Sequence, residues 1–469
     1  MLKIRQGLGK SSASKTDIYI AEKDHRLYII KLFVKEIKKG KGHTIQMGED
    51  YLHELMIYQR LTQELISNSL LQIRNIVPLT ESLQYTFHEL LEKLNKDLKS
   101  PTLSSHKILR NLVDNTLFMI HESRTRVKIN QQSTFDQPLD MNLLHNFGPT
   151  HLDILSTKYM GIVTPKMDQC SFSTFFQEKI KTIPEFMDYL FLILITQLAM
   201  SEIGINQNDL HWGNILVDHQ YLAPHQTRHY LLVYKGFLIW IDKPSTPYIY
   251  DFDRASIQGK YIQHLRYLKH GGNCPTFHKN RDLLKTLCCS YHACMYKSKT
   301  IPIFGMIAQT IMKDLILSSK IRKNIALSNA SCWMATVGQK DSILCQNKDL
   351  DRGMKSWDEC IQWVFSQTQY KKIPLTDLEI PPTRLSVFSY SHSLCQQFFS
   401  IMKNIDQEIQ RSKMNISTFL LHNFQFMGSM HHLLKDPYHQ KTILCLLLHQ
   451  SYLEYKQKKR LHIKKFSIR

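Results

Sequence analysis

The sequence predicts an α+β fold in two lobes, a small β-rich N-terminal lobe and a large helical C-terminal lobe. Residues 16–21 alternate in polarity and are rich in β-branched and aromatic side chains, and residues 27–33 follow a turn as a second apolar run, which is typical of strands. Residues 184–203 are strongly apolar with helical spacing, and the pattern from Asp282 onward is mostly helical. With 469 residues, the chain is also too long for one ordinary core.

The small lobe is expected to begin with a hairpin. Residues 16–21 and 27–33 read as its two strands, and the polar residues 22–25 supply its turn. A helix follows over about 50–67, because its apolar residues recur at helical spacing.

A less regular stretch completes this lobe. Residues 76–79 predict a short strand, and 80–150 predict inserted helices with a polar loop. Residues 159–164 predict a strand that runs into a connector at 165–169.

The large lobe is expected to open with two helices, over 172–181 and 184–203. Residues 230–234 and 237–241 are apolar runs separated by Lys235-Gly236, which indicates a second hairpin with a two-residue turn.

The rest of the chain predicts a strand over 248–254 and then helices to the end. The domain boundaries that follow are 1–165 for the small lobe, with its insertion, 166–300 for the core of the large lobe, and 301–469 for a helical C-terminal extension with a basic tail.

The charge and cysteine content bound the partners and the compartment. A formal net charge of +20 favours acidic partners such as nucleotides, nucleic acid, an anionic membrane face or acidic proteins. The ten cysteines form no CxxC pair, which indicates reduced thiols in an intracellular compartment. We expect no signal peptide and no membrane span, because no apolar run reaches the necessary length.

The stretch QNDLHWGNILVD, residues 207–218, places polar residues between two apolar runs. Such a stretch builds a poor core, but it can hold an acid and a metal ligand at the floor of a cleft. Asp209 and Asn214 are the candidates, and Asp251-Phe252-Asp253 follows a later apolar strand, where a second metal ligand is expected. For the first motif, a simple helix-to-strand turn with a hydrogen-bonded aspartate is the alternative.

A lysine and two glycines upstream are candidates for phosphate binding. Gly7 and Gly9 let the backbone approach a phosphate closely, and Ser12 takes the place of a third glycine; an ordinary turn is the alternative. Lys31 lies in an apolar strand, where an ammonium group needs an anionic partner, unless it is a solvated strand lysine.

Three carboxylates are candidate partners or braces. Glu54, in the helix of 51–61, is the expected partner of Lys31, and Glu49 is the second choice; either is otherwise a surface residue. Asp282 opens a helix, where it either braces the polar loop or serves as a helix N-terminal carboxylate favoured by the macrodipole.

In this order, the motifs resemble those of a eukaryotic-type protein kinase domain over roughly residues 1–300. Asp-Leu-His-Trp-Gly-Asn is most similar to the haspin-like branch, which also has a hairpin before its metal-binding aspartate and lacks an Ala-Pro-Glu motif, as this chain does. The composition also resembles that of kinases of large DNA viruses.

The resemblance implies a bilobal protein-kinase-like fold that uses ATP and Mg²⁺ to phosphorylate serine or threonine in a protein substrate. It assigns roles to the following residues: catalytic, Asp209, Lys31 and His211; nucleotide-binding, Gly7, Gly9, Ser12, Lys31, Glu54, Met167 and Asp168; metal-binding, Asn214 and Asp251.

The chain departs from the family pattern at three positions. Gln207-Asn208 replaces the usual His-Arg, so a phosphorylated activation loop would lack its usual arginine receiver, and we expect a kinase that is not gated in that way. Asp253 replaces a glycine, which reduces the freedom of a hinge. His211 replaces a lysine; it either contacts the transferred phosphate, with a charge that depends on pH, or is a hydrogen-bonded turn residue.

Two other functions remain open. Small-molecule kinases of the aminoglycoside and choline type share the Asp-Leu-His-x-Gly-Asn loop, and Asp251-x-Asp253 fits them equally well; Trp212 and the hairpin favour a protein kinase. A non-catalytic scaffold is the third class.

The basic tail, 456–465, is expected to be solvated, with a nucleic-acid or other acidic partner, or a nuclear address, as the alternative. The expected location is cytoplasmic or nuclear, in a host cell or virion if the protein is viral.

Overall fold

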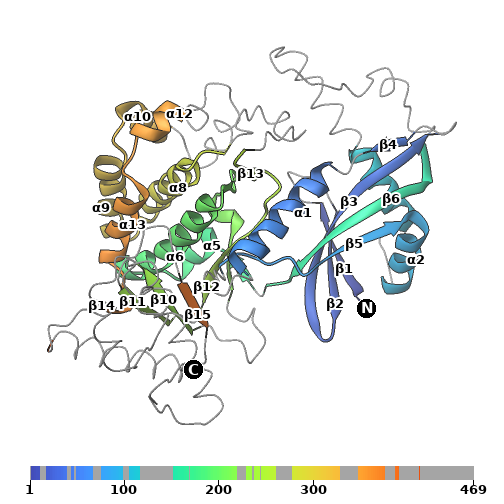
Figure 1. Ribbon diagram of the computed structural model, residues 1–469, viewed down its shortest axis with the longest axis horizontal. Coiled ribbons are helices and arrows are strands. Elements are labelled where there is room, and N and C mark those ends of the chain that lie inside the picture. The colour runs from blue at the N-terminus through green and yellow to red at the C-terminus, as the bar shows by residue number, and fades with distance from the viewer. Residues whose placement is uncertain are drawn as a thin grey trace, which may run out of the picture.

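The computed structural model describes residues 2–10, 17–39, 44–46, 49–66, 75–98, 105–116, 152–167, 169–218, 229–234, 237–242, 245–259, 277–327, 347–374, 386–389 and 411. These residues form the two lobes that the sequence predicts, an antiparallel sheet with helices at one end of the molecule and a mainly helical lobe at the other (Figure 1). Ser12, Asp168, Lys235, Gly236 and the basic tail 456–465 lie outside the described residues.

The small lobe is built on one antiparallel sheet in the order β1-β2-β3-β6-β5, with β4 paired to β3. Its elements are β1 (Lys3–Lys10), β2 (Asp17–Lys23), β3 (Arg26–Lys39), β4 (Thr44–Gln46), α1 (Glu49–Leu61), η1 (Thr62–Ile66), β5 (Glu81–Thr86), α2 (Phe87–Asp97) and β6 (Leu152–Pro165). A further helix covers 105–116.

The alternation along β3 decides what each sheet face contacts. Ile30 and Leu32 are buried in one apolar cluster together with Phe87 of α2. Phe33 belongs to a second cluster with Tyr51 of α1. Because successive side chains of a strand point to opposite faces, Lys31 shares the face of Phe33, toward α1 and the other lobe.

The large lobe packs around one buried helix, α6 (Ile183–Glu202). Around it lie α5 (Phe172–Glu178), α8 (Arg281–Lys297), α9 (Ile303–Thr310), η4 (Ile311–Leu315), α10 (Ser319–Leu327), α12 (Asn347–Arg352) and α13 (Trp357–Ser366). By length and composition, α6 could cross a membrane, but 83% of its most apolar window is buried inside the structure. It therefore serves as a core helix of this lobe.

Short strands carry the loops of interest at the junction of the lobes. The sheet β12-β9-β7 consists of β7 (Gln169–Ser171), β9 (Ile215–Asp218) and β12 (Thr246–Ile249), and β8 (Ile205–Asn206) pairs with β13 (Ser256–Ile257). β9 and β12 are antiparallel and pair with Ile215 opposite Ile249, so the residues before β9 and after β12 lie at the same end of these two strands.

The predicted hairpin forms, and two strands extend it into a sheet. Strands β10 (His229–Tyr234) and β11 (Phe237–Asp242) pair with each other, and β14 (Lys371–Pro374) and β15 (Ser386–Ser389) flank them. The extension after residue 301, expected to be mostly helical, therefore also contains these two strands. Each is four residues long and forms its ladder with a hairpin more than a hundred residues away, which local periodicity does not reveal.

Three smaller predictions also need correction. Residues 81–86, expected within inserted helices, form edge strand β5. The expected strand over 76–79 is reduced to an isolated bridge of Ile76 with Ile249. The strand over 248–254 ends at Ile249, because the chain turns through a positive φ of 60° at Asp251.

Candidate active site

Lys31 connects the two lobes. Its Nζ lies 3.0 Å from Oε2 and 3.3 Å from Oε1 of Glu54 on α1, and 3.0 Å from Oδ1 of Asp251 after β12. The lysine side chain is only 13% exposed, so its charge needs these anionic partners. The ion pair predicted between Lys31 and Glu54 is thus present, and Asp251 joins it.

Glu54, on α1 of the small lobe, is almost completely buried. Burial is the main cause that raises its pKa, Lys31 lowers it, and the nearby carboxylates of Asp251 and Asp253 raise it further. The one lysine therefore faces more negative charge than it neutralises, which makes the site receptive to a further cation. Glu49, the second choice as partner, begins the same helix, but its side chain lies outside the described part of the structure.

Helix α1 is held against the segment that carries Asp251. Nε2 of His53 lies 2.7 Å from the carbonyl oxygen of Ala255, and the ring of Tyr58 packs edge-on against Phe252 at a centroid distance of 5.2 Å. These contacts fix the position of Glu54 relative to Asp251, since each involves a residue next to or one turn from Glu54.

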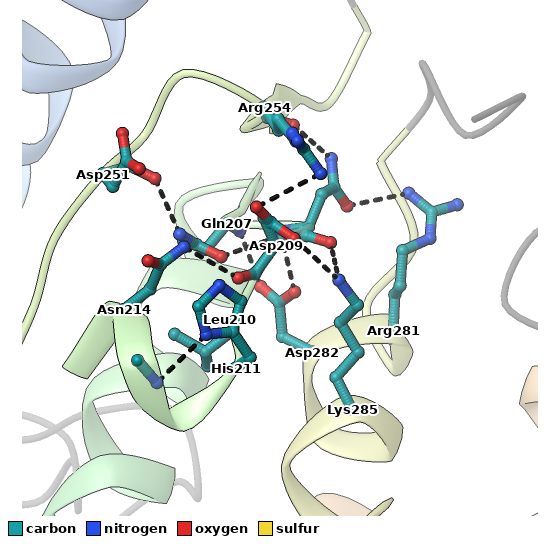
Figure 2. A network of polar contacts seen from close by, with 12 residues as sticks. Gln207, Asp209, Leu210, His211, Asn214, Asp251, Arg254, Arg281, Asp282 and Lys285 are labelled. Atoms are coloured by element: carbon teal, nitrogen blue, oxygen red, sulfur yellow. Dashed lines mark hydrogen bonds and ion pairs between the residues drawn. The ribbon is translucent and has the colours of Figure 1, made fainter. Parts of the chain in front are cut away.

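Asp209 is positioned by Gln207, a fully buried residue. Oε1 of Gln207 accepts the Asp209 backbone N–H at 2.8 Å, while Nε2 donates to the Asp251 carbonyl at 2.7 Å (Figure 2). Nε2 also donates to the Tyr250 carbonyl at 3.1 Å. One amide therefore links the loop of Asp209 to the loop of Asp251.

Asp282, at the start of α8, braces the same loop from below. Its carboxylate accepts the backbone N–H groups of Gln207, at 2.7 Å, and Asn208, at 3.0 Å. Asn208 has a positive φ of 62°, an uncommon conformation that this brace holds. Of the two roles that the sequence left open for Asp282, the geometry shows the brace.

Two cations reach the Asp209 carboxylate from different segments. Nη1 of Arg254 lies 3.2 Å from Oδ2, and Nζ of Lys285, on α8, lies 3.8 Å from Oδ1 (Figure 2). The Asp209 side chain is 11% exposed, and each of its two oxygens faces one of these cations. A carboxylate held in this way is suited to orient a hydroxyl group and to accept its proton.

His211 is a hydrogen-bonded turn residue. Its Nδ1 accepts the backbone N–H of Gly213 at 3.0 Å, which requires that this nitrogen carry no proton. Burial is the main cause that lowers its pKa, so the ring is neutral at neutral pH. The structure therefore favours the turn role over a charged contact with phosphate.

Asn214 and Asp251 offer oxygen ligands of the type that Mg²⁺ prefers. Asn214 donates from Nδ2 to the Asp209 carbonyl at 3.0 Å, which leaves Oδ1 as its ligand atom. The backbone N–H of Tyr250 donates to the Asn214 carbonyl at 3.3 Å, so the two ligands come from adjoining strand ends. The Asp251 side chain is 32% exposed and thus accessible.

These residues fit a magnesium ion that is shared with a nucleotide. The described residues contain no group of three or more His, Cys, Asp or Glu side chains able to hold a metal by themselves. Mg²⁺ often takes only one or two protein ligands and completes its shell with water and phosphate oxygens. The ion would neutralise charge on the phosphates. Burial is the main cause that raises the pKa of Asp251, the Asp253 carboxylate raises it further, and Lys31 lowers it.

The predicted glycines lie in a strand rather than in a turn. Gly7 and Gly9 belong to β1, where Gly9 pairs with Ile18, and Ile18 pairs with Lys31. Directly paired residues share a face of the sheet. Gly9, which has no side chain, therefore lies on the same face as Lys31, two strands away.

Met167, expected to contact a nucleotide base, is 1% exposed. It packs with Val77, Leu216 and Tyr248 at the junction of the lobes. Any contact with a base would therefore involve the surface of this cluster or the backbone beside it.

Sequence reasoning missed Gln207, Arg254 and Lys285 as site residues. The sequence motifs mark Gln207 only as a departure from the family pattern, and they give no role to Arg254 or Lys285. The available signal was the position of Lys285, which follows Asp282 by three residues, about one turn of a predicted helix. Arg254 lies three residues after Asp251, close to that candidate in sequence.

The geometry is that of a bilobal, protein-kinase-like α+β fold. A lysine from the small sheet is joined to a glutamate of the adjoining helix, and both face an acid-amide loop and a second acidic loop in the helical lobe. In protein kinases, these parts hold the phosphates, the metal and the acceptor hydroxyl.

Comparison with known proteins adds limited information. No protein-family model matches the chain, and the search of curated proteins gives no match. Among solved structures, the chain is similar to a MAP kinase from Leishmania major, with 13% identity, 86% of this chain and 94% of the other covered, and a TM-score of 0.35. It is also similar to WaaP in complex with acyl carrier protein, with 10% identity, 65% and 88% covered, and a TM-score of 0.26. At these scores the likeness carries no argument, and the function must be inferred from the site itself.

Proposed function

We propose that this chain is an ATP- and Mg²⁺-dependent protein kinase that phosphorylates serine or threonine hydroxyls and is similar to the haspin-like branch. One observation carries the proposal: Lys31 binds Glu54 and Asp251 together, across the two lobes. A lysine so placed can bind nucleotide phosphates, and Asp251 and Asn214 would hold a Mg²⁺ ion that offsets the charge of those phosphates.

The reaction assigned to the site is an in-line phosphoryl transfer. The acceptor oxygen forms a bond to the γ-phosphorus, and the bond between that phosphorus and the β–γ bridging oxygen breaks, with its electron pair leaving on ADP. Asp209 orients the acceptor hydroxyl and takes its proton. The role of the protein is positioning and charge stabilisation.

Of the two features that suggested the haspin-like branch, the hairpin favours a protein acceptor. The β10–β11 hairpin lies between the two site loops in the sequence, and β14 and β15 extend it into a four-stranded sheet. Trp212, the other feature that suggested the haspin-like branch, is 5% exposed and packs against Phe172 and Phe176 at 4.8 and 4.9 Å. This tryptophan anchors the loop in the core and is not a substrate contact.

A small-molecule kinase is the second candidate, because Asp251-Phe252-Asp253 matches its motif as well. The test uses the full chain with labelled ATP and Mg²⁺. Basic and acidic proteins are offered as acceptors beside an aminoglycoside and choline, with Asp209→Asn as control. We expect label on serine or threonine of a protein and a loss of ~10²-fold or more in rate for Asp209→Asn.

Transfer only to the aminoglycoside or to choline would replace the proposal with the second candidate. A protein that binds no Mg·ATP and labels no acceptor would be a non-catalytic scaffold. The proposal includes an intracellular location, cytoplasmic or nuclear, in a host cell or virion if the protein is viral; it leaves the basic tail without an assigned partner.

A further inference from the structure

The position two residues after Asp209 holds no cation. In the family that the motifs resemble, a lysine stands there, but His211 accepts the Gly213 N–H at Nδ1 and is neutral in that arrangement. The charge that develops on a transferred phosphoryl group must then be balanced by another residue near Asp209.

Arg254 and Lys285 are the cations that contact Asp209, and their environments differ. Lys285 is 1% exposed, and its Nζ donates to the Asn208 carbonyl, so it lies beneath the loop, out of reach of a ligand. The Arg254 side chain is 16% exposed and contacts Oδ2, the oxygen on the other side of the carboxylate (Figure 2).

Arg254 also retains unused hydrogen-bonding capacity. Nδ2 of Asn208 donates to the backbone carbonyl of Arg254 at 3.0 Å, which fixes the backbone from which the arginine side chain extends. Within the described residues, its Nε is buried and has no acceptor. A buried donor without an acceptor is costly. The guanidinium group would satisfy it by turning toward an anionic ligand at Asp209.

We propose that Arg254 is a catalytic residue that contacts the transferred phosphoryl group while it orients Asp209. This inference rests on the proposed kinase activity. The arginine adds no covalent step to the transfer described above; it neutralises charge on the phosphoryl oxygens as the bond to the bridging oxygen breaks. A guanidinium group suits this task because its charge is permanent and its donors lie in one plane.

The opposite role, an inhibitory lock, makes a different prediction. If Arg254 merely occupied Oδ2 and excluded the acceptor hydroxyl, its removal would free the acid and raise the rate. If it contacts the phosphoryl group, removal must weaken binding of a transition-state analogue more than binding of ADP.

The experiment compares Arg254→Met, which removes the charge at similar length, with Arg254→Lys, which keeps it. Arg110→Met is the matched control, because Arg110 lies in the helix of 105–116, far from the site in sequence, 3.8 Å from Asp114. For each variant we would measure kcat, KM for ATP, the melting temperature, and calorimetric affinities for Mg·ADP with and without aluminium fluoride.

We expect Arg254→Met to lose ~10²- to 10³-fold in kcat and a similar factor in aluminium fluoride affinity, with KM and Mg·ADP affinity within about threefold of wild type. Arg254→Lys should recover at least about tenfold of each loss, and Arg110→Met should match wild type. If Arg254→Met melts below the assay temperature, Arg254→Gln, which keeps donors without charge, takes its place with the same expectation.

A rise in kcat on removing Arg254 would overturn the proposal in favour of a lock. Equal losses of Mg·ADP and aluminium fluoride affinity would overturn it too, since they indicate a merely structural role. A wild-type protein that transfers no phosphoryl group would defeat the proposed function itself. An active wild type with an unchanged Arg254→Met variant would defeat only this inference.

Discussion

Lys31 on β3 and Asp251 after β12 are 220 residues apart in the sequence, yet their Nζ and Oδ1 atoms lie 3.0 Å apart across the junction of the lobes. Asp251 reaches this position through a positive φ, which costs a non-glycine residue free energy. The contact therefore marks the point where the two lobes build one site.

Replacing Asp251 tests the metal assignment. We expect Asp251→Asn to lose most of the Mg²⁺-dependent part of ATP affinity, because the amide removes the negative charge that the cation needs. Calorimetric titration of ATP with and without Mg²⁺ measures this. The exposed Asp314, in η4, provides the same substitution as a control without effect. Unchanged Mg·ATP affinity in Asp251→Asn would count against the assignment.

Replacing Gln207 tests the link between the two loops. Gln207→Leu should lower kcat by ~10-fold or more and raise the Mg²⁺ concentration for half-maximal rate, because both loops lose their shared hydrogen bonds. Gln207→His, which restores the residue of the resembled family, should recover part of the loss. Steady-state kinetics over a Mg²⁺ series gives both quantities.

Gln197 supplies a matched control for that substitution. It is also a buried glutamine, on α6, and its Nε2 donates to Oγ1 of Thr286 at 2.7 Å. Gln197→Leu should lower the melting temperature without changing the Mg²⁺ requirement. A shift of the Mg²⁺ requirement in both variants would show that loss of stability, and not loop positioning, is the cause.

Local pattern sufficed where an element carries its own apolar signature. The strands around Lys31 were predicted because they are rich in β-branched and aromatic residues, and α6 because its apolar run is long enough for a buried helix. Strand β5, with the sequence ESLQYT, was missed, because an edge strand with alternating exposure needs few apolar residues. Strands β14 and β15 depend on pairing with a distant hairpin, so their own residues give little signal.

Some contacts of the site also follow from the local sequence, and others do not. The pairing of Lys31 with an acid followed from its apolar neighbours, since a buried ammonium needs an anion. The approach of Arg254 to Asp209 depends on the backbone turns at Asn208 and Asp251, both with positive φ. Non-glycine residues adopt that conformation only when the surrounding structure holds them there, so the sequence alone does not reveal it.

Lys297 is a buried lysine with a structural role, and its replacement tests that role. Its Nζ donates to the carbonyls of Phe176 and, at 3.0 Å, Gln177, near the end of α5. Its Nζ also lies 4.6 Å from the centre of the Phe176 ring. Lys297→Met should lower the free energy of unfolding by about 1–3 kcal/mol, because the carbonyls lose their donor. In urea denaturation, Lys313→Met, at an exposed position, should lie within about 0.5 kcal/mol of wild type. An equal effect in both variants would contradict this role.

His278 predicts a pH dependence of stability. Its Nδ1 accepts the backbone N–H of Asn280 at 3.2 Å and must be unprotonated to do so. Burial is the main cause that lowers its pKa from 6.5, although Asp351 raises it. Because the unfolded chain then binds this proton more readily than the folded one, the contribution to stability is complete above pH 6.5 and is lost as the pH falls below it.

His278→Asn isolates that contribution, because the asparagine Oδ1 can replace Nδ1 as acceptor but does not titrate. We expect the fall in unfolding free energy between pH 7.5 and 5.5 to be smaller in His278→Asn than in wild type, as measured by urea denaturation at each pH. The exposed His88 on α2, replaced in the same way, should leave the wild-type fall in place. If His278→Asn lost as much stability on acidification as wild type, the hydrogen bond to Asn280 would not be the group that titrates.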